Sequence, residues 1–211
     1  MINYDQILPE LYVGSYPGCR DDIDVLKRVC GITAVLNLQT DDDLRDKGLD
    51  WPSLEASYRS IEVRRVPMRD GDHGDQRRML PEGVRALAGL LASGRTVYLH
   101  CNAGVGRSPL VAMAYLYWCR GWTPAEAMRY VEERRPCSPY RDLLQLSCQD
   151  LLRDEAVQRE IARRAYRLFE RRGRRPGDPR QDWADAEREV LQEIMGMDQN
   201  CLGRREPWQG P

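Results

Sequence analysis

The chain has 211 residues, enough to bury a substantial core, and this length favours one domain with an appendage over two full domains. Its 32 basic and 33 acidic residues give a net charge of −1, so no overall electrostatic field favours a nucleic-acid partner. It contains no apolar run of about 18 residues and no basic, apolar leader, so we expect no membrane association and a cytoplasmic location.

The 7 cysteines are scattered along the chain. Their odd number, without a Cys-x-x-Cys pair or the spacing of metal ligands, indicates reduced thiols rather than a disulfide framework or a metal site. We therefore expect a reducing compartment and no metal or other cofactor.

Strands alternate with helices in the first part of the chain. A short strand is predicted at residues 11–14 within an N-terminal segment over 4–15, and a helix with an acidic start and a final glycine is predicted over 21–31. The next elements are a strand over 32–38, a polar stretch through 41–43, a helix over 51–58 and a strand over 61–67. This alternation indicates an α/β fold with a mostly parallel central sheet flanked by helices and a site at the carboxyl ends of its strands.

Residues 70–79 are polar and irregular, which predicts a mobile loop before a helix over 81–92. The loop holds three carboxylates, Asp70, Asp72 and Asp75. A carboxylic acid above a phosphate site can protonate a leaving oxygen, so each of the three is a candidate general acid. The competing interpretation is three solvated loop carboxylates.

A strand over 96–99 leads into a glycine-containing loop, and a helix over 109–116 follows. The candidate site residues here are His100, Cys101, Asn102, Ala103, Gly104, Val105, Gly106, Arg107 and Ser108. A phosphate cradle needs several inward-pointing backbone N–H groups, and Gly104 and Gly106 permit the positive φ values that such a loop demands. The positive end of the helix then faces the anion, and Arg107 offers a planar pair of donors to its oxygens.

Cys101 lies at the mouth of this loop, where a helix N-terminus and a guanidinium favour a thiolate nucleophile. Ser108 can donate to the sulfur, and His100 can organise the loop through a ring hydrogen bond or be a core histidine. An isolated cysteine is usually a small core residue, but the two glycines and Arg107 at this spacing favour the phosphate site. A nucleotide-binding loop is excluded because the ending Gly-Lys-Ser/Thr is absent.

The rest of the chain is predicted to be helical. A cap, a proline and a capping-box glutamate start a helix at residues 123–126, and Arg135 and Ser138 at its end are candidate substrate contacts, against a solvated basic helix end. Apolar residues on one face of each segment predict two amphipathic helices, with Val157, Ile161, Ala165, Leu168 and Phe169 on the first, and Trp183, Ala186 and Val190 on the second. They form a hairpin over 154–196 with a turn at 176–179, and 197–211 are expected to be a flexible tail. The basic cluster at 171–175 is expected to be a solvated helix end.

The sequence His-Cys-x5-Arg-Ser resembles the signature of the cysteine-dependent tyrosine and dual-specificity phosphatases. Residues 101–107 resemble the narrower form found in glucan phosphatases of the laforin and plant starch-excess type, and the similarity extends over about residues 4–152. This resemblance implies a cysteine-phosphatase fold over 1–153. The hairpin resembles a small bacterial helical module of unknown function, which indicates a bacterial source.

The resemblance also implies a mechanism. In the family an aspartate on a loop upstream of the cysteine is the general acid, and Asp70 matches it by register. Cys101 then attacks phosphorus, Arg107 and the loop residues 102–106 hold the phosphate oxygens, and Asp70 protonates the leaving group before acting as base for hydrolysis.

The implied substrate is phosphorylated glucan. The alternatives are a phosphoprotein and, without catalysis, a phosphate-recognising module. Glucan binding uses exposed aromatic side chains, and the candidates, each with a core role as its alternative, are Tyr12, Tyr16, Trp51, Tyr58, Trp122 and Tyr140. The hairpin is a candidate contact for a homodimer or another partner.

Overall fold

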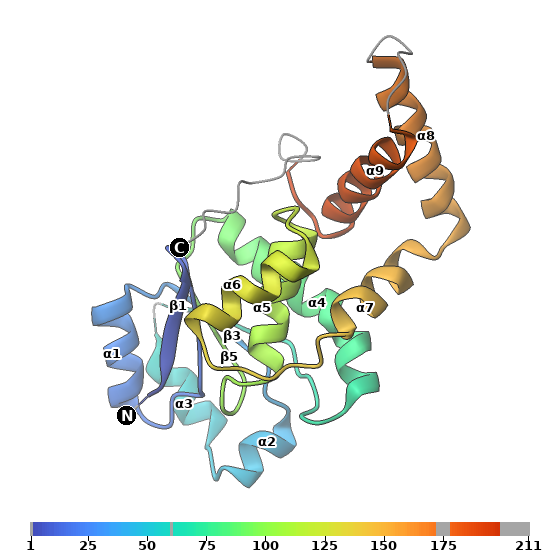
Figure 1. Cartoon of the computed structure of the whole chain (residues 1–211). Coiled ribbons are helices and arrows are strands. Elements are labelled where there is room, and N and C mark those ends of the chain that lie inside the picture. The colour runs from blue at the N-terminus through green and yellow to red at the C-terminus, as the bar shows by residue number, and fades with distance from the viewer. Residues whose placement is uncertain (1, 60, 172–177, 199–211) are drawn as a thin grey trace.

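The computed structural model describes residues 2–59, 61–171 and 178–198. Most of the predicted turn at 176–179, the basic residues 172–175 and the predicted tail from 199 onward lie outside these ranges. Helices cover both faces of a central sheet, and two further helices project from one side (Figure 1). None of the helices within these described ranges is long and apolar enough to cross a membrane.

Five strands form one sheet in the order β1-β2-β5-β3-β4. The strands are β1 (Tyr4–Leu8), β2 (Leu11–Gly14), β3 (Ala34–Asn37), β4 (Glu62–Arg65) and β5 (Val97–His100). Only the β1–β2 pair among these neighbours is antiparallel, so the predicted mostly parallel sheet is confirmed. β1 is not predicted as a strand, because it depends on pairing with β2 and shows no clear alternation of its own.

Alternate strand residues face two separate cores. Val35 and Tyr98 pack with α1 (Arg20–Cys30) and α3 (Trp51–Tyr58) on one face of the sheet. Leu36 and its neighbours in β2 and β5 pack on the other face, against four helices. These are α4 (His73–Ala92), α5 (Arg107–Trp118), α6 (Pro124–Arg134) and α7 (Leu143–Leu152). The period of two along each strand thus produces a three-layer arrangement.

The predicted loop over 70–79 is wrong for most of its length, because α4 begins at His73 rather than at residue 81. The Asp72 side chain caps the helix by accepting from the Asp75 backbone N–H at 2.9 Å. Pro81 lies inside the helix and has no N–H for the Arg77 carbonyl, which instead accepts from Ser147 Oγ at 3.1 Å. What remains of the predicted loop is residues 70–72, and we call this segment together with Arg69 the acid loop.

The polar stretch at 41–43 is also helical. It begins α2 (Asp41–Asp46), in which Thr40 and Asp43 form a capping box with reciprocal side-chain to backbone bonds. The helix is short and is fixed at its N-terminus by this box, which brings Asp43 to a defined position.

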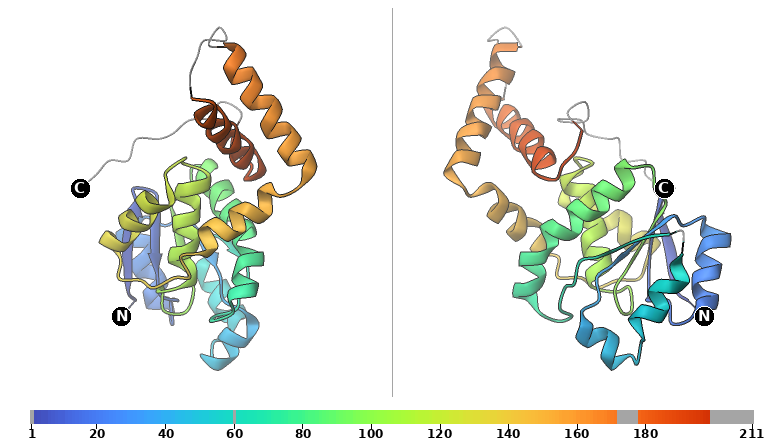
Figure 2. Two further views of the ribbon diagram at one scale, coloured as in Figure 1. Left: turned by 45° about the vertical axis from the view of Figure 1, so that its right-hand side comes forward. Right: turned by 180° about the vertical axis from the view of Figure 1, so that it is seen from behind.

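The predicted helical hairpin is present as α8 (Glu155–Arg171) and α9 (Pro179–Ile194). Figure 2 shows α9 between α8 and the sheet-containing part of the molecule. Leu191 is buried in the main core, and Gln192 Nε2 donates to the Cys119 carbonyl at 2.9 Å. Cys119 caps the C-terminal end of α5, so the hairpin docks at the end of that helix opposite to Arg107. Trp183 does not lie on the packed face as predicted, since it is 38% exposed.

Candidate active site

The residues from Cys101 to Arg107, here called the cysteine loop, connect the end of β5 to the start of α5. In the sheet, His100 is paired with Gly14 of β2 and Asn37 of β3, so three strands end at the same edge. The loop follows this edge directly, at the carboxyl ends of the parallel strands. This is the position predicted from the alternation of strands and helices.

Cys101 is buried, with 3% of its surface exposed. Its sulfur lies 3.3 Å from Ser108 Oγ, which belongs to the first turn of α5. The structure thus brings together the thiol and the hydroxyl that the sequence pairs, and both groups lie at the N-terminal end of one helix. A thiol in this position is suited to nucleophilic attack on a bound phosphate.

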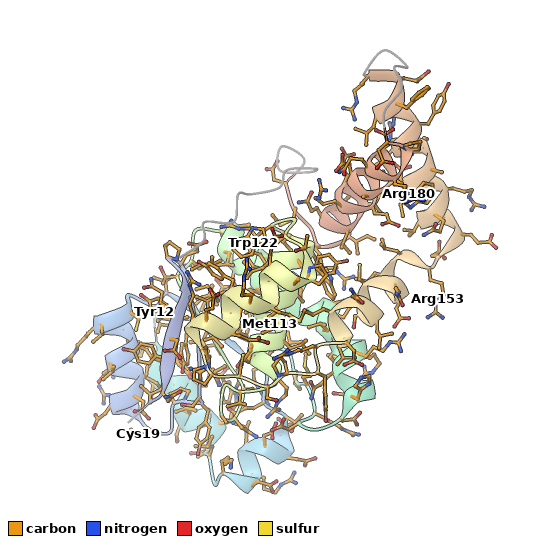
Figure 3. The ribbon with its side chains drawn as sticks, in the orientation of Figure 1. Tyr12, Cys19, Met113, Trp122, Arg153 and Arg180 are labelled. Carbon is orange, nitrogen blue, oxygen red and sulfur yellow. The ribbon has the colours of Figure 1, made fainter. Side chains whose placement is uncertain are left out.

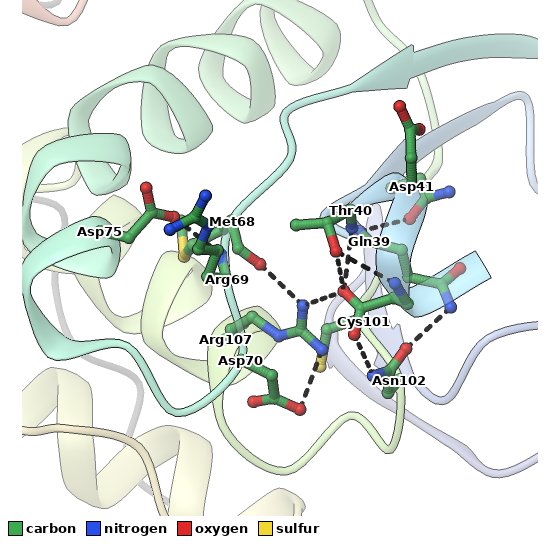
Figure 4. A network of polar contacts seen from close by, with 12 residues as sticks. Gln39, Thr40, Asp41, Met68, Arg69, Asp70, Asp75, Cys101, Asn102 and Arg107 are labelled. Carbon is green, nitrogen blue, oxygen red and sulfur yellow. Dashed lines mark hydrogen bonds and ion pairs between the residues drawn. The ribbon is translucent and has the colours of Figure 1, made fainter. Parts of the chain in front are cut away.

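Arg107 is completely buried. Its Nη1 donates to Asp43 Oδ2 and to the Met68 carbonyl, each at 2.7 Å, and its Nη2 lies 3.0 Å from Asp70 Oδ2 (Figure 4). Within the described part of the chain, Nε and Nη2 have no hydrogen-bond partner. Because these two atoms form one edge of the guanidinium, a planar pair of donors remains available for an oxyanion.

Asp43 is a site residue that the sequence analysis missed. Besides Arg107, its carboxylate accepts from Asn102 Nδ2 at 2.6 Å and from the Thr40 backbone N–H at 2.9 Å. Burial raises the pKa of this carboxyl, but the hydrogen bonds from Arg107, Thr40 and Asn102 outweigh burial and hold the pKa below its usual value. The signal that could have found it is the capping-box pattern Thr-x-x-Asp at 40–43.

The three candidate acids occupy different positions. Asp70 points to Arg107 and is 58% exposed at its side chain. Asp72 caps α4, and Asp75 accepts from the Arg69 backbone N–H at 2.7 Å. Burial raises the pKa of Asp75, but the bonds from Arg69 and Arg78 dominate and lower it. Of the three, Asp70 has the geometry of a group facing the cysteine loop, and the other two hold the start of α4.

His100 is fully buried, and its Nδ1 donates to the Cys101 carbonyl at 3.2 Å. Burial lowers the pKa of His100 to about 4, against which the bond to the Cys101 carbonyl acts only partly. The ring is therefore neutral at pH 7. It organises the loop through a hydrogen bond, and it brings no positive charge to the thiol.

The prediction for the two loop glycines is half right. Gly104 has φ of +70°, and a Cβ there would lie 2.4 Å from Arg135 Nη2 and from the Gly14 backbone. Gly106 is the N-cap residue of α5 and has φ of −107°, and a Cβ placed on it would have no atom within 4 Å. Only Gly104 therefore needs the left-handed conformation.

Arg135 is buried beneath the cysteine loop, with 2% of its surface exposed, so both interpretations from the sequence, a solvated helix end and a substrate contact, are wrong for this residue. Its Nε donates to the Gly104 carbonyl at 2.5 Å, and its Nη1 bonds Asp5 Oδ2 at 2.7 Å. The Ser138 backbone N–H donates to the Val105 carbonyl at 2.9 Å. The segment after α6 thus holds the cysteine loop through hydrogen bonds to the Gly104 and Val105 carbonyls. The Val105 side chain of this loop is 42% exposed.

The aromatic candidates separate into core and rim residues. Tyr58 and Trp122 are buried in the cores and are wrong as glucan contacts; Trp122 lies just before α6 (Figure 3). Tyr12 packs against the core beside α1. Tyr140 is 39% exposed, and its hydroxyl donates to the Gly71 carbonyl of the acid loop at 3.1 Å.

Two half-buried aromatic residues lie on other sides of the cysteine loop. The Tyr16 backbone N–H donates to the Asn102 carbonyl at 3.0 Å. Trp51 lies under the Arg65 guanidinium, at 4.9 Å, and Arg65 bonds the Gln39 carbonyl at 3.2 Å. Gln39 in turn bonds Asn102, so this side of the site is linked to α3. In the part of the chain that the structure describes, no three His, Cys, Asp or Glu side chains are arranged to hold a metal ion.

The sequence and the fold were compared with those of known proteins. Residues 11–145 match the family model described as dual specificity phosphatase, catalytic domain, and residues 156–192 match a family of unknown function, DUF2934. The phosphoglucan phosphatase DSP4 of Castanea sativa is 34% identical over 155 residues, covering 72% of this chain and 41% of that protein. Laforin of Mus musculus is 33% identical over 147 residues, covering 64% and 44%. Dual specificity protein phosphatase 2 of Homo sapiens is 33% identical over 138 residues, covering 63% and 40%.

Solved structures show the same fold at lower identity. PTPMT1 superposes with a TM-score of 0.57 at 23% identity, covering 78% of this chain and 99% of that one. Kinase associated phosphatase, crystallised with its catalytic cysteine changed to serine, gives 0.58 at 23% identity, covering 74% and 97%. The chain matches less than half the length of the three curated relatives named above. Because the family model matches residues 11–145, more than half of the chain, the protein belongs to the dual specificity phosphatase family and has a glucan-phosphatase-like catalytic core. Its C-terminal segment matches the family DUF2934.

Proposed function

We propose that this protein is a cysteine-dependent phosphatase that hydrolyses the phosphate monoesters of phosphorylated glucan. The observation that carries the phosphatase chemistry is the buried Arg107 guanidinium beside Cys101 (Figure 4), whose Nε has no hydrogen-bond partner among the described residues and whose Nη2 has only the ion pair with the exposed Asp70 carboxylate. Orphaned donors on a buried cation are costly unless a ligand satisfies them, and a phosphate supplies two acceptor oxygens with matching geometry. The site is thus built for an oxyanion.

The first step is attack of the Cys101 thiolate on phosphorus. The backbone of the cysteine loop and Arg107 hold the non-bridging oxygens, while the carboxyl of Asp70 gives its proton to the leaving oxygen. Phosphate binding separates Asp70 from Arg107 Nη2, because the oxyanion takes the same donor that Asp70 faces at 3.0 Å. The products of this step are a free hydroxyl on the substrate and a phosphocysteine.

The second step is hydrolysis of the phosphocysteine. Asp70, now ionised, removes a proton from water, which attacks phosphorus and releases inorganic phosphate. The Ser108 hydroxyl, 3.3 Å from the sulfur, donates to the departing thiolate and stabilises it. His100 keeps the loop carbonyl of Cys101 oriented through both steps.

Two observations support glucan as the substrate. Phosphoglucan phosphatases and laforin are 31–34% identical to this chain over about 150 residues. Tyr140 contacts the acid loop, Tyr16 is bonded through its backbone to Asn102, and Trp51 stacks with Arg65, which is linked to Asn102 through Gln39. Aromatic rings near a polar site are the usual platforms for sugar faces. The alternative is a phosphoprotein substrate, which the similarity to dual specificity protein phosphatases supports at 30–33% identity.

We assign the catalytic domain to residues 1–153 and the hairpin to 154–196. The junction falls between the end of α7 at Leu152 and the start of α8 at Glu155. Because the hairpin docks at the far end of α5, its described residues, 154–171 and 178–196, contribute no side chain to the candidate site, and we assign the chemistry to the first domain.

The test is phosphate release from solubilised amylopectin and from a phosphotyrosine peptide at matched concentrations. The variants are Cys101→Ser and, as a matched control, Cys19→Ser, which changes an exposed thiol. Release from amylopectin that only Cys101→Ser abolishes supports the proposal. Release from the peptide alone assigns a protein phosphatase. Binding of phosphorylated glucan without release from either substrate assigns a non-catalytic module.

A further inference from the structure

We propose that Tyr140 is a positioning residue for the general acid, and this inference rests on the proposed function. Its hydroxyl donates to the Gly71 carbonyl, directly after Asp70 in the chain. Tyr140 comes from the segment between α6 and α7, so the contact joins the acid loop to a distant part of the catalytic domain.

Hydrogen bonds fix the residues of the acid loop on both sides of Asp70. The Arg69 backbone N–H bonds Asp75 Oδ2 at 2.7 Å, and the Arg69 carbonyl accepts from Gln76 Nε2 at 3.1 Å. Asp72 caps α4. These contacts are all local to the start of α4, and they leave the Gly71 peptide to be fixed by Tyr140.

Asp70 depends on this backbone for its position. Its side chain is 58% exposed, and its carboxylate contacts Arg107 Nη2, a donor that a bound phosphate takes over. Gly71, with φ of +69°, gives the next peptide unusual freedom. The backbone before Asp70 is anchored at Arg69, so the bond from Tyr140 to the Gly71 carbonyl restrains the backbone on the other side. With both sides held, the direction in which Asp70 leaves the main chain is restricted once substrate has replaced its contact with Arg107.

Tyr140 is itself held in place. The His73 ring packs edge-on against the Tyr140 ring with centroids 5.3 Å apart, and His73 Nε2 lies 2.7 Å from Asp142 Oδ2. His73 is the first residue of α4, and Asp142 precedes α7. We call these three residues, His73, Tyr140 and Asp142, the rim clasp. It connects the first turn of α4 to the segment before α7 across the acid loop.

The clasp matters most for substrates that need a proton. The pKa of an alkyl alcohol is close to that of water and lies far above neutral pH, so a sugar or serine oxygen leaves poorly without a general acid. A nitrophenolate is a stable anion at neutral pH and leaves without help. A misplaced Asp70 therefore slows alkyl phosphates selectively, which a general loss of structure does not do.

The experiment compares the full chain with Tyr140→Phe, which keeps the ring and removes the hydroxyl. The substrates are an alkyl phosphate that the wild type hydrolyses, amylopectin or a phosphoserine peptide, and p-nitrophenyl phosphate. We expect kcat on the alkyl phosphate to fall about 10-fold and kcat on p-nitrophenyl phosphate to stay within about 2-fold of the wild-type value. For the alkyl phosphate, the fall of the rate on the basic side of the pH–rate profile should become less steep. Tyr166→Phe, a change to an exposed tyrosine on α8, is the matched control.

The outcomes separate the two proposals. An equal loss on both substrates, or no loss on either, in an active enzyme overturns the positioning role of Tyr140 and leaves the phosphatase assignment intact. A rise in KM for amylopectin with unchanged kcat also overturns it, because it assigns the Tyr140 hydroxyl, the group that Tyr140→Phe removes, to substrate binding instead of to the acid loop. If the wild type has no cysteine-dependent activity on any of these substrates, both proposals are wrong.

Discussion

Asp43→Asn tests whether a carboxylate from α2 holds Arg107, the proposed oxyanion donor. The substitution keeps the size and one oxygen acceptor of the side chain and removes its charge. In the wild type the two carboxylate oxygens bridge Arg107 Nη1 and Asn102 Nδ2, at 2.7 and 2.6 Å. An asparagine has one acceptor for these two donors, so either Arg107 or Asn102 loses its partner.

The size of the effect follows from burial. The Asp43 side chain is 12% exposed and that of Arg107 is 0% exposed, so the pair is weakly screened by solvent. Removing one partner of a buried ion pair costs about 3–5 kcal/mol, and the remaining Met68 and Asp70 contacts of Arg107 place this case near about 3 kcal/mol. For a chain of this length that corresponds to a fall in Tm of about 6–12 °C. A displaced rather than deleted oxyanion donor lowers kcat/KM by about 10–100-fold.

The assay is steady-state hydrolysis of p-nitrophenyl phosphate together with thermal unfolding. Asp42→Asn is the matched control, because it makes the same chemical change one residue earlier in α2, where the side chain is 76% exposed. We expect the control to keep its activity and to change Tm by no more than about 2 °C. Wild-type kcat/KM in Asp43→Asn, or equal losses in both variants, would refute the assignment of Asp43 as the residue that positions Arg107.

Four further outcomes test other contacts and the charge state of the site. Asp70→Asn should lower kcat on alkyl phosphates about 100-fold and lower kcat on p-nitrophenyl phosphate much less; equal losses on the two substrates would point to another acid. Arg135→Lys should cost about 3 kcal/mol in urea unfolding, because a single ammonium cannot bond both the cysteine loop and Asp5; wild-type stability would contradict this. Ser147→Ala should cost about 1 kcal/mol by unpairing a carbonyl of α4, and an unchanged unfolding midpoint would mean that water replaces the hydroxyl. The stability that Asp43 contributes should be fully present above its unfolded pKa of about 3.9 and disappear as pH falls through its lower folded pKa; a difference between wild type and Asp43→Asn that grows on acidification would reverse the sign.

The C-terminal hairpin adds to the fold without adding to the site. α9 buries Val190 and Leu191 in the core, and Arg164 of α8 is surrounded by Glu160, Glu189 and Glu193, so charge pairing joins the two helices. The two helices pack at the C-terminal end of α5 and share the main core. A change in the hairpin should therefore act on stability or on partners before it acts on turnover.

The sequence by itself was sufficient for features whose signals lie close together in the chain. The cysteine loop with its flanking strand and helix, the cap of α6 at Thr123 and the amphipathic faces of the hairpin all depend on residues a few positions apart. The same holds for the family, because the nucleophile, the arginine and the glycine with positive φ all lie within residues 101–107. Local hydrogen bonds and helix geometry carry this information directly.

Only the tertiary structure decided which distant groups complete the site. Asp43 reaches Arg107 across 64 positions and Tyr140 reaches Gly71 across 69, and no pattern within either segment encodes the partner. The sequence considered alone places Pro81 at the start of a helix, yet α4 begins at His73 and continues through Pro81 because Ser147, 70 positions from Arg77, satisfies the freed carbonyl. Closure of the sheet brings these segments together, and the free energy of burying polar groups then selects the pairs that satisfy them.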